Sequence, residues 1–117
     1  MSGASGGPQS TTAWLCHVNV GSRAEALEIG RAVVEQRLAA CANVLDGLSS
    51  LYRWQGRLEE ADEALLILKT RAELVSALIS RVTELHSYDC PSVVALPIAA
   101  GNPEYLRWIA TETGSEG

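Results

Sequence analysis

The stretch LAACANVLDGLSSLYRWQGRLEEADEALLILKT, residues 38–70, decides the expected fold. Its first half is apolar and carries Tyr52 and Trp54, and its second half passes an acidic segment before ending in the apolar run ALLILKT. Gly56 lies between the halves and can supply the positive φ of a tight turn. The stretch therefore predicts one long β-hairpin that is polar in the middle and apolar at both ends.

The segment before the hairpin predicts a strand followed by a helix. AWLCHVNV, residues 13–20, is rich in β-branched and aromatic residues, as expected of a strand. Ser22 and Glu25 form an S-x-x-E capping box, and apolar residues at helical spacing continue to Leu38. Gly30 lies on this apolar stripe, so the helix is expected to approach a sheet closely.

The segment after the hairpin predicts a second helix, a strand and a short last helix. Thr70 and Glu73 make a second capping box, and amphipathic spacing then runs to about His86. The apolar run SVVALPI follows as a strand. Asn102 as N-cap with Pro103 at the first helical position predicts the last helix.

The expected order is β-α-β-β-α-β plus a short C-terminal helix. This order is the split β-α-β arrangement of ferredoxin-like domains, an α+β two-layer sandwich with its helices on one face of an antiparallel sheet. Residues 65–68 and 93–96 are nevertheless apolar at successive positions, which point to both faces of a strand. We therefore expect another subunit to cover the second face, and hence a homo-oligomer.

The length of 117 residues predicts a single domain, which we place at residues 13–112. Residues 1–12 are expected to be a disordered tail, because MSGASGGPQSTT lacks both the basic region and the apolar region of a signal peptide. Residues 113–117 are expected to be a short C-terminal tail. No apolar run approaches the roughly 20 residues that span a bilayer, so we expect no membrane partner and a cytoplasmic location.

Composition argues against several classes of function. The net charge of −5 disfavours nucleic-acid binding, which needs clustered lysine and arginine. The three cysteines form no C-x-x-C pair, so neither a disulfide framework nor a zinc knuckle is indicated. A P-loop, a nucleophile elbow and a dinucleotide fingerprint are all missing from the sequence, and we do not expect an enzyme.

Five motifs carry a family resemblance. In order along the chain they are RLAACANV, SLYRWQGRLEE, ALLILKT, ELHSYDCPSVVALPI and GNPEYLRWI. They resemble the successive motifs of the CutA divalent-cation tolerance family over nearly all of residues 13–112. The resemblance implies a ferredoxin-like homotrimer whose long hairpins pair across subunit boundaries, with an association with copper and other divalent ions.

The resemblance also implies metal ligands, and copper prefers thiolates and imidazoles. Cys16 matches the family's copper-associated cysteine on the first strand, and His86 matches the histidine of its H-P-Y motif. Here the motif reads H-S-Y, with Ser87 in place of proline and Leu85 where some members carry a second histidine. Two soft ligands are too few for a closed structural site, so copper is expected to bind reversibly and not to be required for folding.

Each candidate ligand also has a purely structural interpretation. Cys16 fits a small apolar side chain in a strand, and His86 fits a cation at a helix C-terminus. Cys41 fits a packed core thiol, whereas Cys90 fits an accessible thiol in a loop. His17 neighbours Cys16 on a strand, so the two side chains point to opposite faces and should not chelate one ion together.

The hairpin supplies two further expectations. Tyr52 and Trp54 are expected to be aromatic anchors in the contact between subunits. The acidic residues lack the oxygen spacing of an EF-hand loop, so we expect a solvated strand segment. These residues are Glu59, Glu60, Asp62 and Glu63.

The alternative function is a trimeric small-molecule sensor or scaffold resembling the PII signalling proteins, which share this architecture. A nucleotide sensor should supply glycine-rich or basic phosphate contacts. The basic residues available for that purpose are scattered: Arg53, Arg57, Lys69 and Arg71. The sequence therefore favours metal binding over nucleotide binding.

Overall fold

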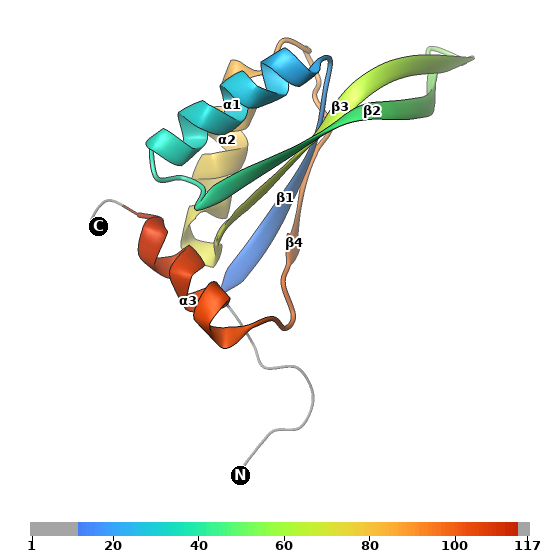
Figure 1. Ribbon diagram of the computed structural model, residues 1–117. Coiled ribbons are helices and arrows are strands. Elements are labelled where there is room, and N and C mark those ends of the chain that lie inside the picture. The colour runs from blue at the N-terminus through green and yellow to red at the C-terminus, as the bar shows by residue number, and fades with distance from the viewer. Residues whose placement is uncertain (1–11, 115–117) are drawn as a thin grey trace.

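The computed structural model describes residues 12–114. In chain order the elements are β1 (Ala13–Val20), α1 (Arg23–Glu35), β2 (Cys41–Trp54), β3 (Arg57–Arg71), the 3-10 turn η1 (Ala72–Leu74), α2 (Val75–Leu85), β4 (Val93–Pro97) and α3 (Pro103–Glu112). The strands form one antiparallel sheet in the order β2-β3-β1-β4, and α1 and α2 lie side by side on one face of it (Figure 1). The expected ferredoxin-like α+β fold is confirmed.

The core lies between the sheet and the helices α1 and α2. Alternate residues of β1 and β3 point into it and are almost completely buried, because side chains alternate between the two faces of a strand. The largest contributors are Val18, Val20, Leu66 and Leu68 from the strands and Ile29, Val33, Leu78 and Val82 from the helices. Removal of these apolar groups from water is the main driving force for folding.

Gly30 allows α1 to lie directly on the sheet, as the sequence predicts. A Cβ atom at Gly30 would be 2.9 Å from Ala42 Cβ and 3.3 Å from Leu66 Cδ1. The first distance is shorter than two carbon atoms tolerate without a backbone shift, so a side chain here would push α1 away from the strands.

The predicted helix caps have different outcomes. Ser22 Oγ accepts from the Glu25 N–H at 3.1 Å, and Asn102 caps α3, so both of these N-caps are confirmed. The capping box at Thr70 is wrong, because β3 continues through Thr70 to Arg71. The Thr70 hydroxyl instead donates to the Leu38 carbonyl at 2.7 Å and joins the end of β3 to the segment after α1.

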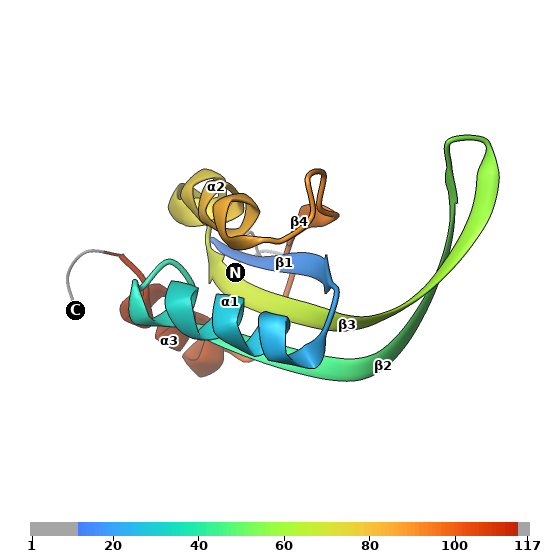
Figure 2. The same cartoon turned by 90° about the horizontal axis from the view of Figure 1, so that it is seen from above.

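The hairpin of β2 and β3 turns sharply and then bends. Gln55 and Gly56 form its two-residue turn, both with positive φ, at 51° and 81°. Positive φ at both turn positions matches the right-handed twist of the flanking strands. A register shift between Leu45 and Leu48 bulges β2, and the outer part of the hairpin curves away from the sheet (Figure 2). This curvature gives the hairpin a concave side.

The face of the sheet opposite α1 and α2 is apolar and largely open. Leu65 and Ile67 of β3 are half-buried on this face, whereas Leu45, Val94 and Leu96 are 60%, 53% and 50% exposed. β3 and β4 therefore carry apolar residues on both faces, as expected from the sequence. Exposed apolar side chains gathered on one face are typical of interaction surfaces.

The C-terminal end of the described chain is packed. Gly114 N–H donates to the Arg37 carbonyl and Arg37 Nε donates to the Gly114 carbonyl, both at 2.9 Å. Thr113 and Gly114, which the sequence assigns to a tail, are buried. Most of the predicted tails, residues 1–11 and 115–117, falls outside the described residues. Within 12–114, none of the helices combines the length and hydropathy needed to cross a membrane.

Candidate functional site

A cavity of about 740 Å³ lies between the concave side of the hairpin and the loop that joins α2 to β4. Ser50, Tyr52 and Trp54 line it from β2, where a spacing of two places them on one face of the strand. Asn19 lines it from the end of β1, and Tyr88 from the loop. Elements that are distant in sequence therefore meet where the hairpin leaves the sheet.

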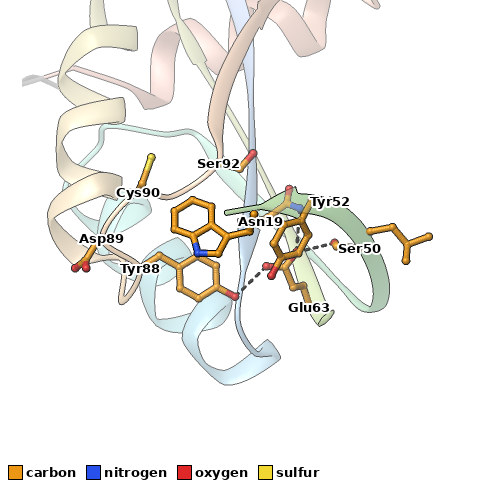
Figure 3. A pocket seen from close by; sticks show the side chains of 10 residues that line it. Asn19, Ser50, Tyr52, Glu63, Tyr88, Asp89, Cys90 and Ser92 are labelled. Carbon is orange, nitrogen blue, oxygen red and sulfur yellow. Dashed lines mark hydrogen bonds between the residues drawn. The ribbon is translucent and has the colours of Figure 1, made fainter. Parts of the chain in front are cut away.

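Glu63 of β3 is the polar centre of the cavity. Its residue surface is only 8% exposed, and its carboxylate accepts three hydrogen bonds. Oε1 accepts from Ser50 Oγ at 2.6 Å and from Asn19 Nδ2 at 3.1 Å, and Oε2 accepts from the Tyr88 hydroxyl at 2.9 Å. Figure 3 shows these side chains and Tyr52 gathered around Glu63.

These contacts keep Glu63 ionised. Burial acts to raise the pKa of its carboxyl group, but the hydrogen bonds from Ser50, Asn19 and Tyr88 and the nearby His86 outweigh burial, so the pKa lies below its ordinary value. Burial and the hydrogen bond to Glu63 raise the pKa of Tyr88 to about 12. At neutral pH the pair is therefore a carboxylate that accepts from a neutral phenol.

His86, which ends α2, holds the loop that carries Tyr88. Its Nε2 is 2.7 Å from the Asn19 carbonyl oxygen, and its Nδ1 is 3.1 Å from the Tyr88 backbone nitrogen. A carbonyl can only accept and a backbone N–H can only donate, so the proton lies on Nε2 and Nδ1 is the acceptor. The imidazole thus ties β1 to the loop, and both of its nitrogens are used.

Comparison with known proteins gives the family. The family model for the CutA1 divalent ion tolerance protein matches residues 14–112, which is nearly all of the described chain. The chain belongs to the CutA1 family. The order of elements and the long hairpin of this chain are those expected from the CutA resemblance of its five sequence motifs.

Similar CutA proteins occur in a bacterium and in an animal. The divalent-cation tolerance protein CutA of Thermus thermophilus is 50% identical over 97 residues, which cover 83% of this chain and 94% of that protein. The CutA protein of mouse is 48% identical over 90 residues, covering 77% of this chain but 51% of the mouse protein. This chain therefore spans about half the length of the mouse relative.

Solved CutA structures share the whole described fold. The crystal structure of CutA from Xylella fastidiosa has a TM-score of 0.87 and 40% identity, covering 89% of this chain and all of that one. The Thermus thermophilus structure has a TM-score of 0.85 and 47% identity, covering 87% and 99%. A third neighbour is the periplasmic CutA of Archaeoglobus fulgidus, with a TM-score of 0.82, 34% identity, and coverage of 86% and 97%.

The two metal ligands implied by the CutA resemblance lie in different parts of the chain. Cys16 of β1 is 1% exposed in the core, and burial raises the pKa of its thiol to about 11. His86 contacts β1 at Asn19, three residues further along the strand, or roughly 10 Å away at the usual rise per residue. Copper binds a thiolate and an imidazole with a free nitrogen, and neither group is available in this arrangement.

The other two cysteines are more accessible than Cys16. Cys41 is half-buried, with its Sγ 3.6 Å from the Tyr105 hydroxyl, whereas Cys90 is exposed in the loop after α2. Among residues 12–114 no group of three or more histidine, cysteine or carboxylate side chains is arranged to hold a metal ion. Within the described part of one chain, the residues therefore do not fit a complete metal centre.

Glu63 is the residue whose role the sequence analysis misses. It is expected to lie in a solvated acidic segment, and Glu60 and Asp62 are indeed exposed, but Glu63 is buried. The alternation of strand side chains contains the missing signal, because Glu63 is in phase with the apolar Leu65 and Ile67 and not with the exposed Glu60 and Asp62.

Proposed function

We propose that this chain is a non-catalytic, homotrimeric CutA protein that contributes to divalent-cation tolerance by binding a divalent metal ion reversibly, with copper as the first ion to test. Membership of the CutA1 family carries this proposal. The Thermus thermophilus and Archaeoglobus fulgidus relatives are described as divalent-cation tolerance proteins. None of the relatives named above bears the name of an enzyme.

The open face of the sheet supports assembly. Val94 and Leu96 of β4 expose apolar side chains there, beside the half-buried Leu65 and Ile67 of β3. Tyr52 and Trp54, which we propose as interface residues, are 45% and 56% exposed in the isolated subunit and are therefore free to make contacts. Burial of this surface between copies would remove it from water, which favours association.

Metal binding rests on the thiols and on His86. Cys16 and His86 remain the ligands that the CutA resemblance implies. Copper would have to displace a proton from the buried thiol of Cys16 and break the two hydrogen bonds of His86, so the subunit must open or rearrange. Cys90 is the most accessible competing ligand, since it is the exposed thiol among the three cysteines.

A copper titration of the purified protein tests the metal proposal. Wild type is compared with Cys16→Ser, Cys41→Ser, Cys90→Ser and His86→Ala, each first checked for its oligomeric mass. A large loss confined to Cys16→Ser, with a smaller loss for His86→Ala, is the expected result. Undiminished binding in Cys16→Ser, or a loss only in Cys90→Ser, would contradict the ligand assignment and leave an adventitious surface thiol.

Light scattering tests the trimer. The expected mass is three times that of the 12.5 kDa subunit. Leu96→Glu should reduce assembly because it places a charge in the open apolar face, whereas Ala24→Glu on the exposed surface of α1 is the matched control. A wild-type monomer at micromolar concentration would contradict the proposal.

We place the protein in the cytoplasm. All three cysteines are free, and two of them are accessible, which suits a compartment that keeps thiols reduced. Fractionation of the source cells tests this assignment. The periplasmic description of the Archaeoglobus fulgidus relative makes the periplasmic fraction the comparison to include.

The cavity beside Glu63 favours a second candidate function, a PII-like small-molecule sensor. A metal carrier would not require a cavity of this size lined by aromatic side chains. Mass spectrometry of the protein under native conditions separates the two candidates, since it detects retained metal, a retained organic molecule, or neither.

A further inference from the structure

The open face of β3 carries opposite charges at its two ends. Every second residue of the strand points to this face, because side chains alternate along a strand. From the hairpin side to the end of the strand these residues are Glu63, Leu65, Ile67, Lys69 and Arg71. The face therefore runs from a carboxylate, over two apolar side chains, to two cations.

The acidic end lacks a countercharge. The hydroxyl protons of Ser50 and Tyr88 and an amide proton of Asn19 point to the Glu63 carboxylate, and one acceptor position on Oε2 remains unused. None of the ion pairs within residues 12–114 gives Glu63 a lysine or arginine partner. A buried charge is costly unless it is paired, so this carboxylate would gain from a cation.

The basic end lacks a carboxylate. Lys69 Nζ donates to Asn43 Oδ1 at 3.2 Å and lies 5.7 Å from the centre of the Tyr105 ring, and both of these partners are neutral. None of the ion pairs within the described chain includes Lys69. The lysine stem is flexible and its hydrogen bond to an exposed amide contributes little, so the ammonium group can exchange that amide for a carboxylate.

Arg71 is less free to make such a contact. Its Nε is buried without a hydrogen-bond partner in the described chain, and its guanidinium group packs against Gly114. Burial therefore holds this side chain at the end of the sheet. Lys69 is the cation of the open face that is able to reach out from it.

Glu63 and Lys69 of one chain cannot pair with each other. Lys69 follows Glu63 by six positions on the same strand, which corresponds to roughly 20 Å at the usual rise per residue. A lysine side chain does not cover that distance. Only a second copy of the chain can bring the ammonium group of a Lys69 to Glu63.

The charges also decide which ends of two copies meet. A closed ring of three copies uses a contact in which two different patches of each subunit face one another. Contact between like ends would bury two carboxylates or two cations together, whereas contact between unlike ends pairs them. Tyr52 and Trp54 line the cavity at the acidic end, and aromatic faces attract an ammonium group (Figure 3). The acidic end is thus complementary to the basic end of a neighbour.

We propose that the cavity beside Glu63 receives the ammonium group of Lys69 of the partner subunit, which forms an ion pair with Glu63 next to Tyr52 and Trp54. This inference rests on the proposed trimer and adds the residue pair that fixes how neighbouring subunits are oriented. Each subunit of the ring gives one lysine and receives one. Ser50 and Asn19 are positioning residues, because they hold the carboxylate that accepts the lysine.

The rate of subunit exchange tests the proposal. Light scattering first establishes the mass of the wild type. Unlabelled and ¹⁵N-labelled trimers are then mixed, and mass spectrometry under native conditions follows the appearance of mixed trimers. Loss of one partner of a buried charge pair acts mainly on dissociation, so Lys69→Met should exchange at least about tenfold faster than wild type. Lys69→Arg keeps the charge and should stay within about threefold of wild type.

A double-mutant cycle shows whether the two residues act on each other. Glu63→Gln should also accelerate exchange, and the double variant with Lys69→Met should be no more than about threefold faster than the faster single variant. Arg31→Met removes a charge from the exposed surface of α1, on the other side of the sheet, and is the control. Its effect and that of Glu63→Gln should multiply. Each variant is first checked for wild-type folding and trimeric mass.

Lys69→Glu gives a reading that needs no change at Glu63. It sets a second carboxylate against Glu63, so it should exchange faster than Lys69→Met. Equal rates for these two variants, or effects of Glu63→Gln and Lys69→Met that multiply, would overturn the ion pair while leaving the trimer intact. Coupling of Glu63→Gln to Arg71→Met, and not to Lys69→Met, would assign the cavity to the other cation. A monomeric wild type would contradict the trimer itself, and that result is seen before any variant is compared.

Discussion

The Tyr88 hydroxyl donates a hydrogen bond of 2.9 Å to Glu63 Oε2, although 25 residues separate the two in sequence. This contact joins the loop after α2 to the hairpin at the point where the hairpin leaves the sheet (Figure 3). It also directs the Tyr88 hydroxyl proton to Glu63, so the Tyr88 oxygen presents only acceptor lone pairs to the cavity.

Tyr88→Phe should lower the free energy of unfolding by about 1 kcal/mol, because it removes a hydrogen bond to a charged group. The cost stays this small because Tyr88 is 39% exposed, so water can replace part of the lost hydrogen bond. Glu63 retains its bonds from Ser50 and Asn19, so the fold should survive. Urea unfolding measures the change. Tyr52→Phe is the control, since no hydrogen bond of its hydroxyl is lost among the described contacts, and an equal effect in both variants would assign no special role to the Tyr88 bond.

Glu63→Gln should flatten the acid side of the stability profile. The pKa of Glu63 in the folded protein lies below its ordinary value of 4.5, so the ionised group stabilises the fold above that pH. This contribution is lost as the pH falls from 4.5 through the folded pKa. The free energies of unfolding of wild type and Glu63→Gln, measured from pH 7 to 3, should therefore converge at the acid end. Parallel curves over the whole range would contradict the assignment.

The three thiols should react at very different rates. At pH 8 a thiol with a pKa of about 11, as for Cys16, is ionised in roughly one molecule in a thousand, and Cys16 is also buried. Cys90 is exposed and should react first with a disulfide reagent, followed by the half-buried Cys41. Cys90→Ser should abolish the fastest phase. Rapid labelling of Cys16 in the native protein, found by peptide mass analysis, would mean that the core opens readily.

Trp54→Ala should loosen the assembly more than it alters the isolated subunit. Truncation of a buried aromatic residue typically costs about 3–5 kcal/mol, but Trp54 is 56% exposed within the subunit, so a cost of that size requires burial against another copy. The melting temperature should therefore fall together with the trimer fraction. An unchanged trimer with unchanged melting would show that Trp54 is not an interface residue.

Much of the fold follows from local patterns. Gly56 specifies the hairpin turn, Ser22 and Asn102 specify helix starts, and Gly30 specifies where α1 approaches the sheet. Each of these depends on backbone geometry that only a few residue types satisfy. The capping box expected at Thr70 failed because strand pairing between β1 and β3 extends to Arg71, and local sequence does not reveal how far two strands pair.

The candidate site was only partly predictable. Cys16 and His86 were selected by ligand chemistry and family resemblance, whereas the structure places one in the core and uses both nitrogens of the other for hydrogen bonds. Glu63 was grouped with its acidic neighbours, although strand alternation turns it to the side opposite Glu60 and Asp62. Residue type indicates what a side chain is able to bind, but not what it already contacts.

The sequence by itself determined the class of fold, the long hairpin, the apolar residues on both faces of β3 and β4, and the CutA family, because these depend on spacing and residue type along the chain. Only the tertiary structure decided that Asn19, Ser50, Glu63 and Tyr88 meet, and that Cys16 and His86 stay apart. The physical reason is that the bulge in β2 and the resulting bend bring the hairpin toward a loop far away in sequence. The direction of such a bend arises from packing and strand pairing across the whole domain, which no local pattern encodes.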